Sequence, residues 1–155
     1  MIGGASNVGG KILRQHFSDK ELIELSEKIN PAVPSGLDYY PLTEPGERFP
    51  VNDPNLQPRL TPRPDDKVIF LQGILEGIAK VENRCLDLMS EISGTKPARL
   101  FTSGGGAMNR VFSEIRQRVH GIPTEQSLFS EAAYGSAILA LKGDTKPKIE
   151  YEQVY

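Results

Sequence analysis

The sequence predicts an α/β fold, and three observations carry that prediction. A long helical pattern of apolar residues follows Pro64, with polar residues on the opposite half of the helix. The last third of the chain alternates a short strand candidate, a glycine-rich turn, a helix, a second strand candidate and another helix. At 155 residues the chain has about the length of one domain and is long enough to bury a core.

Composition and charge exclude several classes of protein. Hydrophobic residues make up 38% and charged residues 25% of the chain, which argues against disorder and against a collagen-like fibre. The net charge of −2 gives no electrostatic reason to expect nucleic-acid binding. No apolar run approaches the roughly 20 residues of a membrane helix, and no signal-peptide pattern is visible, so no membrane partner is expected. Because the lone Cys85 cannot form an internal disulfide, we expect a reducing compartment, the cytoplasm.

The first 30 residues begin with a glycine-rich segment and continue as helices. Ile12, Leu13 and Phe17 form one apolar stripe of a first helix. Ser18 and Glu21 have the spacing of a capping box, which predicts a second helix over residues 19–28. Thirty residues are too few for an independent core, so we expect this part to belong to the same domain as the rest.

Proline is concentrated between residues 31 and 64, where nine of the 12 prolines lie. Each proline ring removes a hydrogen-bond donor and restricts the residue before it, so this stretch cannot hold a long helix. We expect an extended segment with turns that wraps the domain, with short edge strands near residues 37–40. A linker between two domains is the alternative.

The strongest periodic pattern predicts a helix that begins after Pro64 and ends near Gly94. Glu82 intrudes on its apolar arc, and we interpret that residue as lying at the margin and reaching water. Cys85 lies on the arc and is interpreted as a core residue. The positions that fall within about 180° of the helical wheel are Val68, Leu71, Ile74, Leu75, Ile78, Ala79, Val81, Cys85, Leu86, Leu88, Met89 and Ile92.

The last third of the chain is divided into short elements. In chain order we expect a strand at 99–102, a glycine-rich turn at 103–107, a helix at 109–120, a strand at 122–126 and a helix from Ser130 to Lys142. Gly121 and Gly143 would close the two helices. Residues 144–155 are charged, and we expect them to form a loose tail.

The stretch Ser103-Gly-Gly-Gly-Ala-Met-Asn109 is the most informative part of the sequence. Three glycines between a strand and a helix permit positive φ and let a ligand approach the backbone, since no Cβ intervenes. Free N–H groups at the start of the next helix favour a phosphate or another acceptor. Asn109 serves either as an early helical residue or as an amide donor to a ligand. A tight turn that binds nothing is the alternative.

Two nucleotide-binding motifs nearly match, and both fail. The dinucleotide fingerprint needs a third glycine where Asn109 stands, which disfavours a dehydrogenase domain, although Glu125 lies at a plausible distance for a ribose-binding acid. A phosphate-binding Walker loop would end at Gly10-Lys11-Ile12, but the first glycine and the metal-binding hydroxyl are missing.

The remaining chemically active residues receive structural interpretations. His16 and His120 have no second ligand at metal spacing, so no metal site is predicted. His120 falls in the last turn of its helix, and we expect it at the surface. The arginines that we interpret as a solvated helix face are Arg110, Arg116 and Arg118.

Six segments taken together resemble the C-terminal lobe of the FGGY carbohydrate kinases. They are Gly3–Gly10, Leu37–Leu42, Gly46–Pro50, Leu71–Ala79, Ser103–Asn109 and Glu131–Gly135. The resemblance runs from about Ile2 to Leu141 and points to the xylulose-kinase-like D-ribulose kinases of plants and cyanobacteria. It implies an actin-like (ribonuclease H-like) ATPase lobe, a mixed sheet flanked by helices, over residues 1–143.

The resemblance also implies a nucleotide site. In that family ATP lies between two lobes, with its adenosine part on the lobe that this chain resembles, and Mg²⁺ accompanies ATP with ligands mainly on the other lobe. Phe112 stands where related kinases often carry tryptophan. The residues that match the family's nucleotide-contacting positions are Gly10, Leu13, Arg14, Gly104, Gly105, Gly106 and Asn109.

The family's catalytic residues belong to the other lobe, so none is assigned here. Its phosphate loop, sugar-binding residues and aspartate base have no counterpart in this chain. Asp38 is the one aspartate with aromatic neighbours, Tyr39 and Tyr40, that could shift its pKa by desolvation.

Several expectations about the whole protein follow from this resemblance. The parent enzyme would phosphorylate a ketopentose, D-ribulose or D-xylulose, with ATP, ADP and the sugar as partners. We expect it in the cytoplasm, or in the plastid if its source is a plant. The isolated chain should be inactive and should self-associate through the face that the other lobe would cover. The alternative is a non-catalytic fragment that binds nucleotide or packs against a partner.

Overall fold

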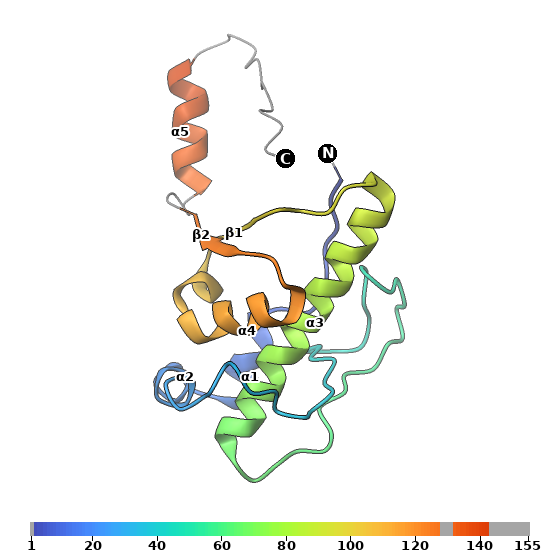
Figure 1. Cartoon of the computed structure of the whole chain (residues 1–155), viewed down its shortest axis with the longest axis vertical. Coiled ribbons are helices and arrows are strands. Elements are labelled where there is room, and N and C mark those ends of the chain that lie inside the picture. The colour runs from blue at the N-terminus through green and yellow to red at the C-terminus, as the bar shows by residue number, and fades with distance from the viewer. Residues whose placement is uncertain (1, 128–131, 143–155) are drawn as a thin grey trace.

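Helix α3 (Lys67–Ser93) is the longest element, and most of the protein is arranged along it (Figure 1). The computed structural model describes residues 2–127 and 132–142. Asp66 caps the helix, its carboxylate accepting a hydrogen bond from the Val68 N–H at 2.7 Å. Gly94 ends it at φ +71°, a left-handed conformation that favours glycine. The predicted start after Pro64 and the predicted end near Gly94 are both confirmed.

The core lies along the N-terminal half of α3. Leu71, Ile74 and Ala79 are fully buried there, together with Phe70 and Leu75. In the C-terminal half Cys85 is only half-buried, and the side chain of Ile92 is 68% exposed. The apolar arc predicted from the sequence is therefore mostly buried over its first half and mostly half-buried over its second, where Ile92 is exposed.

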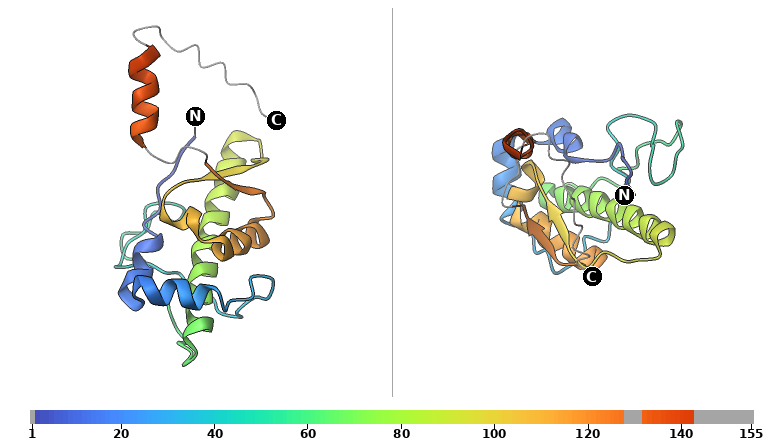
Figure 2. Two further views of the ribbon diagram at one scale, coloured as in Figure 1. Left: turned by 90° about the vertical axis from the view of Figure 1, so that its left-hand side faces the viewer. Right: turned by 90° about the horizontal axis from the view of Figure 1, so that it is seen from above.

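The N-terminal residues fold into three short helices that pack against the start of α3 (Figure 2). They are the 3₁₀ helix η1 (Gly10–Ile12), α1 (Leu13–His16) and α2 (Asp19–Ser26). The predicted capping box is present: Ser18 Oγ accepts from the Glu21 N–H, and the Glu21 carboxylate accepts from the Ser18 N–H at 2.9 Å. Glu21 also pairs with Lys67 at 2.8 Å, which ties α2 to the start of α3. Helix α2 ends two residues before the predicted limit.

Residues 31–64 run as an irregular chain beside α3, as the blue-green trace in Figure 1 shows. The expected edge strands near 37–40 reduce to one isolated bridge between Tyr40 and Arg59. The segment approaches α3 closely at Gly77, where a Cβ would lie 2.8 Å from the Tyr39 carbonyl oxygen. The side chain of Tyr39 is buried in the core and its hydroxyl donates to the Pro62 carbonyl.

The last third forms a small β-α-β unit on the other side of α3. Its elements are β1 (Leu100–Thr102), the 3₁₀ helix η2 (Gly105–Met108), α4 (Arg110–His120) and β2 (Thr124–Gln126). The two strands pair in parallel, with Leu100 opposite Thr124, and α4 packs against α3. Parallel strands need such a crossover helix, which is why the glycine turn and α4 lie between them. A mixed sheet was expected from the resemblance. The described residues instead form a sheet of these two parallel strands.

Helix α5 (Ala132–Lys142) stands apart from the other elements in two views (Figures 1 and 2). Its apolar side chains are exposed, Leu139 at 62% and Leu141 at 87%. The predicted cap Ser130, the closing Gly143 and the tail 144–155 lie outside the described residues. No helix in the described part of the chain has the length and apolar character needed to cross a membrane.

The face of α4 that was expected to be solvated is partly buried against α3. Arg116 is 7% exposed and binds Glu82 through two hydrogen bonds, one of them 2.7 Å long. Glu82 therefore pairs with Arg116, whereas we expected it from the sequence to reach water. The side chain of His120 is fully buried, 4.0 Å from Glu82, so its predicted surface position is wrong. Of the three arginines, Arg110 alone is largely solvated.

Arg118 also departs from the expected solvated face. It donates to the Glu76 carboxylate at 2.6 Å and to the Pro31 carbonyl. Glu76 is 3% exposed and accepts further hydrogen bonds from Ser35 and Gln72. Burial raises the pKa of Glu76, but these donors outweigh it and lower the pKa below its usual value. The two arginine–glutamate pairs thus join α4 to α3 through charged groups as well as through apolar packing.

Candidate functional site

The glycine turn between β1 and α4 presents bare backbone to solvent. Gly104 has φ +81° and ψ −172°, a conformation open to glycine and to almost no other residue. A Cβ built at Gly104 or Gly105 would meet nothing within 4 Å, and one at Gly106 would lie 3.6 Å from the Phe112 ring. All three glycines are exposed. A ligand can therefore reach the main chain of this turn without meeting a side chain.

Asn109 joins the glycine turn to two helices. Its Oδ1 accepts a hydrogen bond from the Phe112 N–H at 3.0 Å, which makes it the N-cap of α4. Its Nδ2 donates to Ser26 Oγ at 3.0 Å, at the end of α2. The amide has a second N–H, which has no partner among the described residues. Asn109 is thus the N-cap that precedes α4 rather than an early residue of the helix, and its predicted role as an amide donor to a ligand stays a prediction.

The other predicted nucleotide residues lie where η1 passes into α1. Gly10 begins η1, and a Cβ at this position would meet nothing within 4 Å. Leu13 is half-buried and packs against the core, whereas Arg14 is exposed and pairs with Asp19 at 3.3 Å. Both side chains of that pair are more than three-quarters exposed, so the pair adds little to stability.

Helix α2 is contacted at its two ends by one residue from each group of predicted nucleotide residues. Arg14 pairs with Asp19 at its first residue, and Asn109 bonds to Ser26 at its last. Eight residues of α-helix at about 1.5 Å per residue separate these attachment points by roughly 11 Å. The sequence contained no signal for the Ser26 contact, because Ser26 and Asn109 are 83 positions apart.

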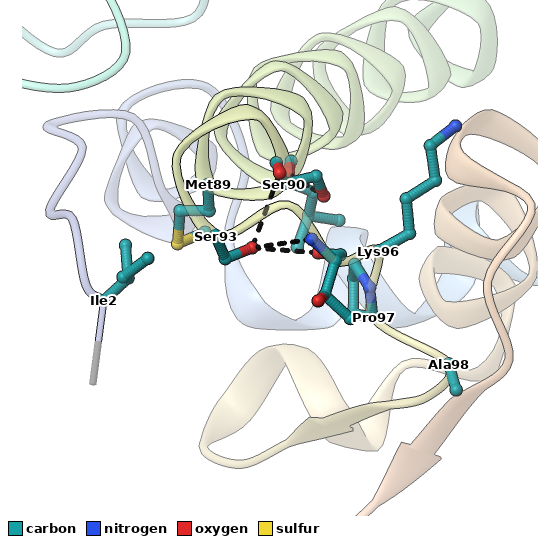
Figure 3. Close-up of a pocket in the computed structure, with 9 residues that line it drawn as sticks. Ile2, Met89, Ser90, Ser93, Lys96, Pro97 and Ala98 are labelled. Carbon is teal, nitrogen blue, oxygen red and sulfur yellow. Dashed lines mark hydrogen bonds between the residues drawn. The ribbon is translucent and has the colours of Figure 1, made fainter. Parts of the chain in front are cut away.

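Two hollows of the surface are lined by other residues than those of the predicted nucleotide site. One of about 500 Å³ lies at the C-terminal end of α3 and is lined by Ile2, Lys96 and apolar atoms (Figure 3). Its serine hydroxyls are used internally, since Ser90 donates to the Leu86 carbonyl and Ser93 to that of Thr95. None of the predicted nucleotide residues lines this hollow.

A second hollow of about 420 Å³ lies beside the buried Glu76 and is bordered by Lys80 and Arg118. It too contains none of the predicted nucleotide residues. Those residues therefore lie outside both of these hollows, with the glycine turn on an open surface. Small-molecule sites normally bury most of the ligand surface, so a second wall would be needed to enclose a nucleotide here.

The environment of Asp38 and the grouping of the acidic, histidine and cysteine side chains bear on acid–base and metal chemistry. Asp38, the aspartate singled out for its aromatic neighbours, has a side chain that is 71% exposed and pairs with Arg59 and Lys80. It is therefore solvated rather than desolvated against Tyr39 and Tyr40. Across residues 2–127 and 132–142, no three His, Cys, Asp or Glu side chains are grouped so that they could hold a metal ion.

Comparison with known proteins identifies the family of the chain. Residues 1–143 match the C-terminal domain of the FGGY family of carbohydrate kinases. A stretch of 82 residues, 52% of the chain, is 33% identical to the autoinducer-2 kinase of Photorhabdus laumondii subsp. laumondii. That stretch covers 16% of the relative's length, so the chain spans a small part of this curated relative. The finer resemblance to D-ribulose kinases stays a prediction. Because the family match extends over most of its length, the chain belongs to the FGGY family of carbohydrate kinases, within the region of the C-terminal domain.

Proposed function

We propose that this chain is the nucleotide-side lobe of an ATP-dependent sugar kinase whose substrate is a ketopentose, D-ribulose or D-xylulose. The observation that carries the proposal is the glycine turn, whose exposed backbone precedes the N-terminus of α4 in a member of a carbohydrate kinase family. Backbone N–H groups at such a helix start favour phosphates and other acceptors. The second N–H of Asn109 would add a donor for the nucleoside.

The adenosine part of ATP would lie along the surface between the glycine turn and the start of α1. Gly104, Gly105 and Gly106 would contact it at one end, and the segment of Gly10, Leu13 and Arg14 would border it at the other. Mg²⁺ would enter with ATP, held by the phosphates and by groups of the other lobe.

The second wall of the site would come from an N-terminal lobe. Phe101 on β1 is 65% exposed and Met108 at the end of the turn is 76% exposed. Exposed apolar side chains on both sides of the turn support a face that is covered in the whole protein, or by a second copy when the lobe is alone. The sugar site and the catalytic base would be on the other lobe.

A titration of the chain with ATP, measured by calorimetry, tests the nucleotide site. Gly105→Val places branched carbon in open space over the turn, so it should weaken ATP binding roughly tenfold or more, with little change in melting temperature. Gly3→Val is the matched control, because Gly3 is also exposed and has no atom within 4 Å of its Cβ position. Equal ATP affinity in the two variants would contradict the site.

A parallel titration with NAD should show weaker binding than ATP, and the reverse order would favour a dehydrogenase.

A further inference from the structure

Glu47 is a buried carboxylate in the segment 31–64 with no part in the site described above. It is 3% exposed, and four donors surround it. They are the Ser6 hydroxyl at 2.8 Å, the Asn7 N–H at 2.7 Å, the Arg48 N–H at 2.9 Å and the Tyr40 hydroxyl at 3.0 Å. A carboxylate removed from water needs donors of this kind to remain charged. Two of the four belong to the N-terminal segment, so Glu47 ties that segment to residues 40–48.

Asn7 completes the connection from the other side. Its Nδ2 donates to the Gly46 carbonyl at 3.0 Å, and its Oδ1 accepts from Arg48 Nε at 2.8 Å. Gly46 has φ +109°, and a Cβ there would lie 3.1 Å from the Pro54 carbonyl oxygen, so the turn requires glycine. We call this set of contacts between residues 6–7 and 46–48 the N-terminal clamp. It gives a physical role to the Gly-Glu-Arg part of a motif that the nucleotide site had not used.

The clamp lies shortly before two glycines, Gly9 and Gly10, that carry no side chain to anchor them. A Cβ at Gly9 or Gly10 would meet nothing within 4 Å, and the Gly10 carbonyl accepts a hydrogen bond from the Leu13 N–H in η1. The anchors on either side are the clamp and the buried Ile12, which is 1% exposed. The Val8 N–H extends the clamp by donating to Ser6 Oγ at 2.9 Å. Gly10 therefore lies between two anchors, the clamp with Glu47 on one side and η1 with the buried Ile12 on the other.

We propose that Glu47 is a positioning residue for nucleotide binding, holding residues 6–10 so that Gly10 borders the nucleotide. The proposal rests on the proposed function, in which Gly10 is part of the ATP site. Glu47 would not touch the nucleotide. Its effect would pass through Ser6 and Asn7 to the glycine pair, because groups that orient ligand-contacting residues affect affinity without contacting the ligand.

Glu47→Gln tests the proposal in the 155-residue chain, with ATP as the probe. The variant keeps the shape of the side chain but removes its charge, and its NH₂ group faces either the Asn7 and Arg48 N–H donors or the Ser6 and Tyr40 hydroxyls, which must then turn to accept. We expect ATP affinity to fall roughly tenfold, by analogy with groups that orient metal ligands.

Glu76→Gln is the matched control, since Glu76 is also 3% exposed and hydrogen-bonded, but to Ser35, Gln72 and Arg118. It should lower the melting temperature and leave ATP affinity unchanged. Equal losses of affinity in both variants, or none in Glu47→Gln, would overturn the proposal.

Hydrogen–deuterium exchange without nucleotide separates this proposal from the proposed function. Residues 6–10 should take up deuterium faster in Glu47→Gln than in Glu76→Gln, and equal uptake would overturn the positioning role. Faster uptake combined with no ATP binding by the unmodified chain would overturn the proposed function and leave Glu47 as a structural clamp. Where Glu47→Gln does not fold, Asn7→Ala removes the contacts to Gly46 and Arg48 at an exposed residue, and the same two outcomes apply.

Discussion

His120 is a buried histidine whose hydrogen bonds require the neutral ring. Its Nδ1 accepts from the Ile122 N–H at 3.1 Å, so this nitrogen carries no proton, while Nε2 faces Glu82 at 4.0 Å. Burial lowers the pKa of His120 below its ordinary value of 6.5. Glu82 acts to raise that pKa and Arg116 to lower it, and the net direction is downward. Protonation would therefore break the contact that joins the end of α4 to the loop before β2.

The lowered pKa of His120 predicts a loss of stability in mild acid. Because the folded pKa lies below 6.5, the unfolded chain takes up the proton first as the pH falls. The contribution to stability is complete above about pH 6.5 and declines as the pH falls below it toward the folded pKa. The melting temperature should fall between about pH 7.5 and about pH 5.5, and less steeply in His120→Gln.

The second histidine supplies the control for this pH dependence. Burial, aided by the charge of Arg63, also lowers the pKa of His16. His16→Gln should therefore remove its own share of the slope and keep that of His120. An unchanged slope in His120→Gln would show that the ring is not the group that titrates.

Arg116 and Glu82 form the charged contact between α4 and α3. Removing one partner leaves the other poorly solvated, so Arg116→Met should cost roughly 2–4 kcal/mol of unfolding free energy. The double variant Glu82→Gln, Arg116→Met should recover part of that loss, as a double-mutant cycle in urea would show. The control Arg110→Met, at a side chain that is 90% exposed, should change stability by less than about 0.5 kcal/mol. Strictly additive losses would mean that the pair contributes no coupling.

At the scale of the elements, the wrapped segment and α3 depend on two glycines. A Cβ at Gly77 would lie 2.8 Å from the Tyr39 carbonyl oxygen and 3.0 Å from Pro41 Cδ, whereas at Gly73 the nearest atom is the flexible Leu37 Cδ1. Gly77→Ala gains helix propensity of up to about 1 kcal/mol. The clash with backbone should outweigh that gain, giving a net loss of roughly 1–3 kcal/mol in urea denaturation. We expect a smaller loss for Gly73→Ala, and stabilisation by Gly77→Ala would contradict the close approach.

Local signals in the sequence predicted the helices well because each signal acts within a few residues. The Ser18–Glu21 capping box and the closing Gly94 and Gly121 all depend on contacts inside one turn. The order of strand, glycine turn, helix and strand was also predicted, whereas the parallel pairing of the two strands is a finding of the structure.

Contacts between distant elements could not be predicted in the same way. A helical pattern tells which face of α4 is polar, but not that Glu82 and Glu76 on α3 face it. Arg116, Arg118 and His120 were therefore placed in solvent, although the structure buries them wholly or in part. The one available hint was a glutamate on the apolar arc of α3, which needs a cationic partner when it is buried. The Ser26–Asn109 bond and the N-terminal clamp had no comparable signal.

At the scale of the whole molecule, the described aspartates have structural or surface roles away from the glycine turn. Asp66 caps α3, and Asp38 pairs with Arg59 and Lys80. Asp53 accepts from the N–H of Asn55 inside its own loop. Asp19 pairs with Arg14, Asp87 bonds to Asn83 within α3, and Asp65 is exposed. Asp144 lies outside the described residues.

These positions lead to the prediction that the chain alone will not phosphorylate a sugar. Phosphoryl transfer depends on positioning the nucleophile and neutralising charge around it, and a general base must lie within hydrogen-bond reach of the reacting hydroxyl. Asp38 is exposed and already paired with two cations, so Asp38→Asn should leave both ATP binding and the absence of turnover unchanged.

The assay is ATP consumption with D-ribulose, D-xylulose or glycerol, first by this chain and then by a mixture with a separately produced N-terminal lobe. We expect turnover only in the mixture and only with a ketopentose, because the second lobe would supply both the sugar site and the base. Sugar-dependent turnover by the chain alone, abolished by Asp38→Asn, would contradict the two-lobe proposal. Tight ATP binding with no activity in the mixture would favour a non-catalytic nucleotide-binding fragment.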